Sequence, residues 1–180
     1  MKVSVYIATS LDGFIARKDG ALDWLPGIES PESPEGEDYG YHEFMDSIDV
    51  LIMGRNTFET VLSFEGDWPY GAKRMFILSS QPVTIPNELT DSVESSSSSP
   101  GELIAQLAKG GFQHVYVDGG KTIQSFLRVG LIDELIITRI PILIGSGIPL
   151  FGEADADIQL KHLETHTFSN GLVQSRYQII

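Results

Sequence analysis

Short apolar runs recur along the chain and end at glycine, proline or serine residues. Continuous apolar runs of this kind indicate strands that are buried on both faces of a sheet. They predict strands at residues 2–10, 50–54, 74–80, 114–117 and 134–140, with a short edge strand at 92–94.

Between these runs the apolar residues recur at spacings of three and four, which is typical of amphipathic helices. This pattern predicts helices at residues 39–47, 55–62, 100–109 and 122–129. Asp38 precedes the first helix and Ser99 the third, and both residue types cap helix N-termini. Strands that alternate with helices indicate a largely parallel sheet with helices on both faces.

The last part of the chain has a different pattern. Two alternating runs, at residues 158–168 and 172–179, flank Asn170-Gly171, and this combination predicts an antiparallel hairpin. The expected fold class is therefore α/β: a three-layer α/β/α arrangement with a mixed, mostly parallel sheet and a C-terminal antiparallel hairpin. The length of 180 residues favours a single domain over residues 1–180.

Ligands of such sheets bind beyond the carboxyl ends of the strands. Small or polar residues stand at several of these ends: Ala8, residues 54–57, Ser79-Ser80 and residues 118–122. The Gly119-Gly120 pair permits a tight turn that exposes backbone N–H groups at a helix N-terminus, and Lys121 adds a full positive charge. This stretch therefore predicts a phosphate site, although an ordinary strand-to-helix turn would have the same pattern.

Composition narrows the set of partners. The 12 Lys and Arg residues are outnumbered by 25 Asp and Glu, and the net charge of −13 disfavours nucleic acid and anionic membranes. Arg55, Lys73, Arg74 and Lys121 nevertheless fall beside strand–helix junctions, where they either bind a small anion or are ordinary solvated side chains. With no cysteine and no signal-peptide or membrane-spanning pattern, we expect a cytoplasmic protein.

Missing motifs argue against several kinds of site. Neither the Gly-x-Gly-x-x-Gly pattern of dinucleotide-binding folds nor a P-loop is present. His162 and His166 are four residues apart, but they fall in the predicted hairpin, where that spacing does not form a helix face, so no metal site is expected. Ser79 has no evident histidine and acid partners, which argues against serine hydrolysis.

Three strand–helix junctions, taken together, resemble those of dihydrofolate reductases. They are Met53 to Glu59 (Met-Gly-Arg-Asn-Thr-Phe-Glu), Phe76 to Pro82 (Phe-Ile-Leu-Ser-Ser-Gln-Pro) and Val117 to Ile123 (Val-Asp-Gly-Gly-Lys-Thr-Ile). Their order and spacing agree with that family over nearly the whole chain. Trp24-Leu25-Pro26 and residues 143–152 look closer to the reductase domain of riboflavin-biosynthesis deaminase-reductases, which shares the fold.

The resemblance implies a reductase that uses NADPH to transfer hydride to a small heterocycle of the ribosylated pyrimidine or pterin type. The cofactor-binding residues that it implies are Ala8, Ile15, Gly54, Arg55, Asn56, Thr57, Leu78, Ser79, Ser80, Val117, Gly119, Gly120, Lys121 and Thr122. Of these, Ala8 and Ile15 would border the nicotinamide, and Ser79, Ser80 and Lys121 would surround the adenosine 2′-phosphate.

The same resemblance implies a substrate site formed by Trp24, Asp38, His42 and Thr138, with Asp38 and Thr138 as catalytic residues. Asp38 matches the substrate carboxylate of the family, and a carboxylate near an apolar pocket can have a raised pKa. Its ordinary role would be a helix cap. Thr138 matches a threonine that supports the same substrate edge, or it is simply a β-branched strand residue.

Two other functions stay open: a dihydrofolate reductase proper, and a nucleotide-binding module without catalysis. The acidic loop at 29–37 disfavours an anionic substrate such as dihydrofolate. The Pro- and Gly-rich segment 19–37 is expected to cover the nicotinamide as a lid. The resemblance also suggests a homodimer, for which the apolar stretch 131–151 either supplies the surface or forms core.

Overall fold

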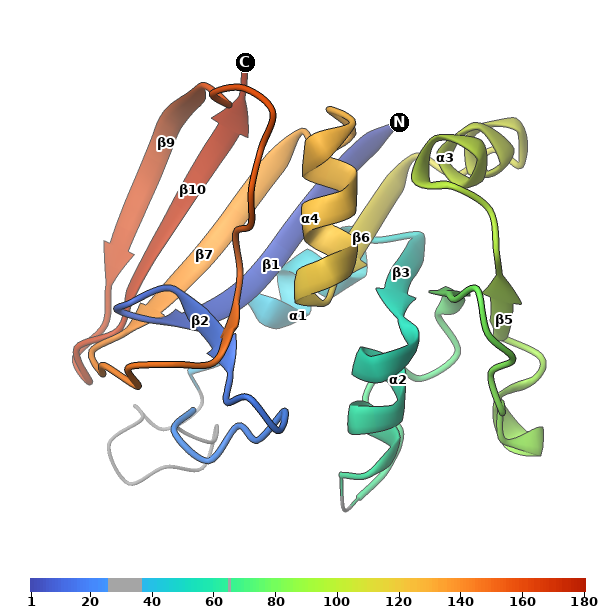
Figure 1. The fold of residues 1–180 in the computed structure, drawn as a ribbon, viewed down its shortest axis with the longest axis horizontal. Coiled ribbons are helices and arrows are strands. Elements are labelled where there is room, and N and C mark those ends of the chain that lie inside the picture. Colours follow the sequence, from blue (N-terminus) through green and yellow to red (C-terminus); the bar gives the residue numbers. More distant parts are fainter. Residues whose placement is uncertain (26–36, 65) are drawn as a thin grey trace.

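The computed structural model describes residues 1–25, 37–64 and 66–180 and is built on an eight-stranded sheet (Figure 1). Its strand order is β5-β4-β3-β6-β1-β7-β10-β9. In chain order these strands are β1 (Lys2–Ser10), β3 (Val50–Gly54), β4 (Arg74–Leu78), β5 (Val93–Ser96), β6 (His114–Asp118), β7 (Glu134–Ile140), β9 (Leu160–Thr167) and β10 (Val173–Ile179). A second sheet pairs β2 (Phe14–Ala16) with β8 (Ile148–Pro149).

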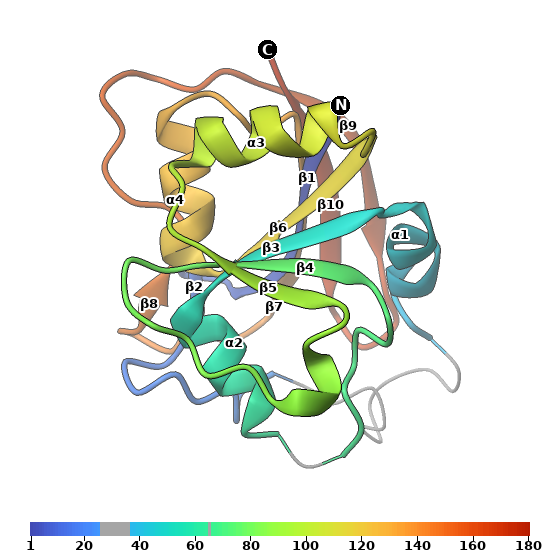
Figure 2. The ribbon, with the colours of Figure 1, turned by 90° about the vertical axis from the view of Figure 1, so that its right-hand side faces the viewer.

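Helices cover both faces of the large sheet (Figure 2). The α-helices are α1 (Tyr41–Ser47), α2 (Arg55–Leu62), α3 (Pro100–Lys109) and α4 (Gly120–Arg128), and a short 3-10 helix spans Asn87–Leu89. Leu103 of α3 and Phe126 of α4 belong to one buried cluster. Phe44 of α1 and Phe58 of α2 belong to a second cluster. The predicted three-layer α/β/α architecture is confirmed.

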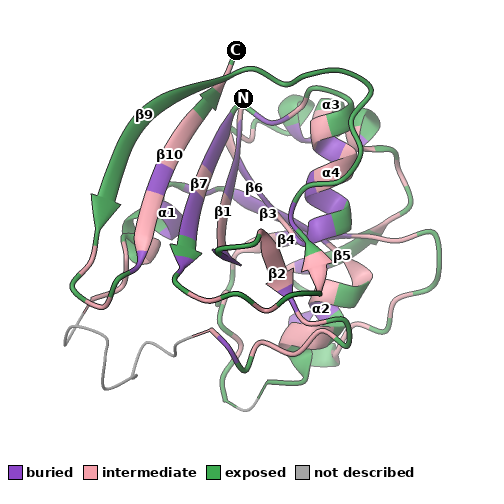
Figure 3. Ribbon diagram, turned by 60° about the vertical axis from the view of Figure 1, so that its left-hand side comes forward, coloured by how far each residue is buried: buried purple, intermediate pink, exposed green. Residues whose placement is uncertain are grey.

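The sheet is parallel from β5 to β7 and antiparallel at the β10–β9 end. The hairpin forms where Asn170-Gly171 predicts it, and Gly171 takes the φ of +84° that favours glycine. β9 is exposed at every residue, as Figure 3 shows. The other edge strand, β5, has only four residues. The two edges of the sheet thus differ in how much backbone they leave open.

Several predicted element ends differ from the structure. α1 begins at Tyr41 rather than Tyr39 because Tyr39 and Gly40 both have positive φ, 58° and 82°, which no α-helix accepts. α4 begins at Gly120 rather than Thr122, since the carbonyl of Gly119 already accepts the N–H of Ile123. β4 ends at Leu78, and a turn through Ser79 follows. The lid expected at 19–37 falls largely outside the described residues, which omit 26–36.

The apolar stretch 131–151 is core in its first half only. Ile132, Leu135, Ile137 and Ile140 are buried, as is Leu150, whereas Leu143 and Phe151 are exposed. Residues 141–149 are exposed or half-buried, so the alternative of an apolar interface applies to this second half. Within the described part of the chain, no helix has both the length and the apolar character needed to cross a bilayer.

Candidate functional site

Parallel pairing brings the predicted cofactor residues to one edge of the sheet. In the register, Gly54 faces Leu78 across β3 and β4, and Met53 faces Asp118 across β3 and β6. On the other side of β6, Ala8 of β1 faces Thr138 of β7. The carboxyl ends of these strands therefore lie together, and α2 and α4 both start from this edge.

Glycines allow the starts of α2 and α4 to touch. A Cβ atom on Gly119 would lie 2.3 Å from Thr57 Oγ1, and one on Gly54 would lie 2.8 Å from Thr122 Oγ1. Gly119 also has a φ of +90°, which side chains rarely adopt. Only glycine fits at both positions, so the two helix N-termini stand side by side with their N–H groups at one site.

The small β2–β8 sheet lies against the start of α4. A Cβ on Gly120 would approach Ile15 Cδ1 of β2 to 3.0 Å and the carbonyl oxygen of Pro149 to 3.2 Å. The Gln124 amide of α4 donates to that same carbonyl at 3.0 Å. Ile15, predicted to border the cofactor, therefore belongs to the same site as the Gly-Gly turn.

Two cations stand at the paired helix starts. Among the described residues, the ion pair of Arg55 is with Glu59 of its own helix, at 3.8 Å. Lys121 is exposed and makes no ion pair with the described residues. Ser79 is held in a turn by hydrogen bonds of its hydroxyl with the backbone of Gln81, and Ser80 is exposed. The cations are thus available to an anion at this edge.

The last residue of β6 is a carboxylic acid, Asp118, which lies in the predicted 118–122 junction but was given no role of its own there. Asp118 alternates with Tyr116, so its side chain lies on the face of the sheet that α1 and α2 cover. Its Oδ1 accepts the N–H of Gly119 at 2.7 Å. Burial raises the pKa of Asp118 to about 6, against the lowering effect of that hydrogen bond. A polar residue directly before Gly-Gly, at the end of an apolar strand, is the signal that could have identified it.

The charge of this acid influences several tyrosines. Burial raises the pKa of Tyr41 to about 12, and the charge of Asp118 adds to the shift. Burial also raises the pKa of Tyr70 strongly, again with a contribution from Asp118. Tyr41 comes from α1 and Tyr70 from the segment after α2, so the charge of Asp118 acts on residues that are distant from it in the sequence.

Asp38 has a different environment. Its Oδ2 accepts the backbone N–H of His42 at 2.9 Å and contacts His42 Nδ1, while Oδ1 accepts the N–H of Gly40 at 3.0 Å. The backbone N–H of His42 is the main cause of a lowered pKa for Asp38. The expected raised pKa is therefore wrong, because the carboxylate is bonded to the start of α1. Asp38 and His42, both predicted substrate residues, do lie in contact.

Thr138 is linked to the segment that carries Asp38. The amide of Gln174 donates to Thr138 Oγ1 at 3.0 Å and to the carbonyl oxygen of Tyr39 at 3.0 Å. The Tyr6 hydroxyl donates to the same carbonyl at 2.8 Å. Thr138 is buried, so it connects β7 and β10 to the residue next to Asp38.

Trp24, the remaining predicted substrate residue, packs beside Ile140 and Leu172, with Ala8 in the same cluster. It is 7% exposed, and its Nε1 has no hydrogen-bond partner among the described residues. Trp24 therefore lies near the carboxyl ends of β1 and β7, and its role in substrate binding stays a prediction.

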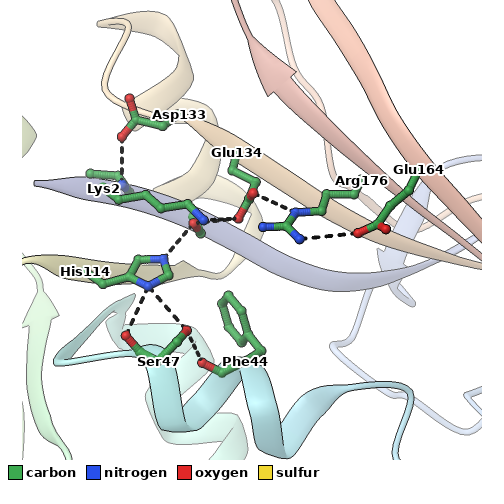
Figure 4. Close-up of polar contacts among 10 residues, drawn as sticks. Lys2, Phe44, Ser47, His114, Asp133, Glu134, Glu164 and Arg176 are labelled. Carbon is green, nitrogen blue, oxygen red and sulfur yellow. Dashed lines mark hydrogen bonds and ion pairs between the residues drawn. The ribbon is translucent and has the colours of Figure 1, made fainter.

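A cavity of about 480 Å³ lies between α1 and the β9–β10 hairpin. Glu134, which faces it, accepts from Lys2 Nζ and Arg176 Nε at 2.7 Å each, and Arg176 Nη1 reaches Glu164 at 3.3 Å (Figure 4). None of the predicted site residues lines this cavity. Among the described residues, no group of three or more His, Asp or Glu side chains is placed to hold a metal ion.

Solved structures share this fold along the whole chain. A protein from Shewanella sp. PV-4, named for riboflavin biosynthesis, has 43% identity and a TM-score of 0.92, covering 100% of this chain and 99% of that one. A diaminohydroxyphosphoribosylaminopyrimidine deaminase/5-amino-6-(5-phosphoribosylamino)uracil reductase from Thermotoga maritima has 16% identity and a TM-score of 0.73, covering 99% of this chain and 56% of that one.

A dihydrofolate reductase from Enterococcus faecalis, complexed with NADP(H), has 18% identity and a TM-score of 0.66, covering 99% of this chain and 96% of that one. At such identities the last two likenesses show the fold alone. The model of one family, described as the RibD C-terminal domain, matches residues 1–174. By that match, the chain belongs to the RibD C-terminal domain family.

Proposed function

We propose that this chain is an NADPH-dependent reductase that transfers hydride to a small heterocycle of the ribosylated pyrimidine or pterin type. The observation that carries the proposal is the contact between the starts of α2 and α4 through Gly54 and Gly119. Two adjacent helix N-termini with nearby cations suit a pyrophosphate. The family membership supports a reductase of the riboflavin-pathway type.

The residues at the carboxyl edge fit NADPH. Cβ atoms at Gly54, Gly119 and Gly120 would meet Thr122, Thr57 and Ile15, so the three glycines let the two helix starts and β2 pack against one another. Arg55, Ser80 and Lys121 are exposed or half-buried polar groups that suit a 2′-phosphate. When bound, NADPH supplies the hydride, and Ala8 and Ile15 would border its nicotinamide ring.

Reduction of a C=N or C=O group adds a hydride to carbon and a proton to nitrogen or oxygen. Asp118 is suited to donate that proton, because a carboxyl group with a pKa of about 6 is still partly protonated near neutral pH. Solvent then reprotonates the carboxylate. Asp38, whose pKa is lowered, would orient the substrate edge together with Thr138 rather than supply the proton.

Cofactor titration tests the assignment. NADPH should bind well over tenfold more tightly than NADH, since charge-assisted bonds to a phosphate contribute ~1.5–3 kcal/mol each. Equal affinities would contradict the 2′-phosphate site. Tight NADPH binding without oxidation in the presence of dihydrofolate or any aminopyrimidine substrate would favour the nucleotide-binding module instead.

The proposal includes a homodimer. β9 leaves its outer edge unpaired and all its residues exposed, among them Leu160 and Leu163 at 41% and 43%. Such an edge is a template for pairing with another chain. Sedimentation at increasing protein concentration measures the assembly, and a monomer at every concentration would contradict it.

A further inference from the structure

The residue that follows Asp38 has a backbone conformation that side chains disfavour. Tyr39 has a φ of 58°, and within the described part of the chain it is the one residue other than glycine with a positive φ. Such a conformation persists only where surrounding contacts hold it, and it is often found at functional sites. Gly40 follows with a φ of 82°, so this turn determines how Asp38 lies against the start of α1.

Two donors from the sheet meet at the carbonyl oxygen of Tyr39. The Tyr6 hydroxyl of β1 donates to it at 2.8 Å, and the Gln174 amide of β10 donates to it at 3.0 Å. The same amide donates to Thr138 Oγ1 at 3.0 Å and lies 3.2 Å from the Tyr6 hydroxyl oxygen. One hydrogen-bonded network thus holds the backbone directly after Asp38.

The turn of the C-terminal hairpin holds the side chain of the same tyrosine. The Asn170 amide donates to the Tyr39 hydroxyl at 2.8 Å, and the Tyr39 ring packs edge-on against Phe168 with the centroids 4.9 Å apart. Tyr6, Asn170 and Gln174 are 33, 131 and 135 positions away from Tyr39 in the sequence. The conformation of Tyr39 is therefore held by tertiary contacts from β1, β10 and the hairpin turn.

This conformation in turn fixes the carboxylate of Asp38. Its Oδ1 accepts the N–H of Gly40 at 3.0 Å, and its Oδ2 accepts the N–H of His42 at 2.9 Å. Both N–H groups come after Tyr39 in the chain, and a rotation about the backbone dihedrals of Tyr39 would turn them away from Asp38. The donors at the Tyr39 carbonyl therefore act on the position of the Asp38 carboxylate.

We propose that Tyr6 and Gln174 are positioning residues, which act through the carbonyl of Tyr39 to hold the Asp38 carboxylate in place at the substrate site. The inference rests on the proposed function, in which Asp38 orients the substrate edge. It adds a role for the C-terminal hairpin, because β10 supplies Gln174 to a site that otherwise lies at the ends of the parallel strands.

NMR titration of the Asp38 carboxyl group tests the inference without any substrate. Tyr6→Phe removes the hydroxyl alone, and Gln174→Met removes the amide at similar volume. In each variant the bonds from the Gly40 and His42 N–H groups should weaken, so the pKa of Asp38 should rise toward its ordinary value of 3.8. The rise should be largest in the double variant, and an unchanged pKa there overturns the inference.

Ser175→Ala is the matched control. Ser175 is the next residue of β10 and is buried, but its hydroxyl lies 2.9 Å from that of Thr165, on the opposite face of the sheet from Gln174. The control therefore loses a side-chain hydrogen bond of the same strand, and it should leave the pKa of Asp38 at the wild-type value. A rise equal to that of Gln174→Met would attribute the effect to any disturbance of β10 and overturn the inference.

Steady-state kinetics connects the network to the substrate site. A misplacement of about 1 Å can lower a rate about 10²-fold. With saturating NADPH and a phosphoribosylaminopyrimidine as the probe, the Tyr6→Phe/Gln174→Met double variant should therefore lose about tenfold in kcat/KM, mainly through KM, with NADPH affinity unchanged. An unchanged KM overturns the inference. A wild-type protein that does not turn over contradicts the proposed function instead, and the titration still decides whether the two donors fix Asp38.

Discussion

Two carboxyl groups, Asp118 and Glu134, lie on the same face of the sheet near opposite ends of the parallel strands. Glu134 begins β7, and Lys2 and Arg176 both bond to it (Figure 4). Asp118 ends β6 and, among the described residues, accepts one hydrogen bond, from the adjacent Gly119 N–H. Burial opposes ionisation at both sites, but only Glu134 is compensated by cations, which lower its pKa.

The difference indicates that Glu134 is a structural charge and that Asp118 is a candidate for a reactive group. The Glu134 cluster joins β1, β7, β10 and β9, and each charge in it has a partner. Asp118 instead faces tyrosines at the edge where two helix N-termini open. A group with a displaced pKa beside a ligand site is a candidate for proton transfer. Substitutions at one of the two carboxyl groups at a time test this difference.

The largest effect is expected for Asp118→Asn. Loss of a positioned proton donor typically lowers a rate by ~10²–10⁴-fold, so turnover should fall by that order. NADPH affinity should stay close to that of the wild type, because the cofactor residues are untouched. Steady-state kinetics with a cofactor titration measures both, and a turnover within twofold of wild type would remove Asp118 from the chemistry.

Stability should depend on pH with opposite sign at the two carboxyl groups. The pKa of Asp118 rises from 3.8 to about 6 on folding, so the native state holds a proton that the unfolded chain has released. Its contribution to the unfolding free energy therefore falls by at most about 3 kcal/mol as pH rises through this window. The lowered pKa of Glu134 gives stability above its ordinary pKa that is lost as pH falls.

Denaturant unfolding of wild type, Asp118→Asn and Glu134→Gln between about pH 2.5 and pH 8 isolates these slopes. Asp118→Asn should gain stability relative to wild type as pH rises, whereas Glu134→Gln should lose it. Parallel curves for wild type and Asp118→Asn would mean that the acid titrates normally.

Gly119→Ala should weaken both folding and cofactor binding. Alanine at a φ of +90° is strained, and its Cβ would lie 2.3 Å from Thr57 Oγ1. Strain of this kind costs about 1–3 kcal/mol, and displacing Thr57 separates the two helix starts. Gly130→Ala is the matched control, because Gly130 has a φ of +65° but no neighbour within 4 Å of the added Cβ. Calorimetric titration with NADPH should show a loss for Gly119→Ala alone.

Glu134→Gln should destabilise the protein without changing its chemistry. The change leaves Lys2 and Arg176 without their shared carboxylate, and hydrogen bonds to charged groups contribute about 1.5–3 kcal/mol. Turnover per folded molecule should be unchanged. Glu164→Gln provides the control at the exposed end of the same cluster, where a pair contributes about 1 kcal/mol or less. A loss of turnover in folded Glu134→Gln would mean that the Glu134 end of the sheet influences the chemistry at the opposite end.

The sequence predicts the elements of this fold because each is encoded locally. The apolar runs and Asn170-Gly171 fix strands and hairpin, and the Gly-Gly turn marks the start of α4. The start of α1 is less predictable, since no local pattern required a positive φ at Tyr39. No role of its own was predicted for Asp118 for a similar reason: its pKa is raised by burial, which only the folded chain produces.

The smallest effect on stability is expected for Asp38→Asn. Asp38 bonds to the N–H groups of Gly40 and His42 at the start of α1, and asparagine caps helices about as well as aspartate. The contact with the exposed His42 side chain contributes little in water. The unfolding free energy should therefore change by less than about 1 kcal/mol, whereas Asp38→Ala, which cannot cap, should lose about 1 kcal/mol.

Turnover distinguishes the two roles proposed for this carboxylate. If Asp38 orients the substrate, Asp38→Asn should raise KM more than it lowers kcat, because asparagine keeps the hydrogen-bond acceptor and loses only the charge. If Asp38 is instead the catalytic carboxylate that the family resemblance implies, kcat should fall by ~10²–10⁴-fold, as for a proton donor. In that case, and if Asp118→Asn keeps its turnover, the proton would reach the substrate from the part of the site where Asp38 and Thr138 lie. The difference between Asp118 and Glu134 would then affect stability but not the chemistry.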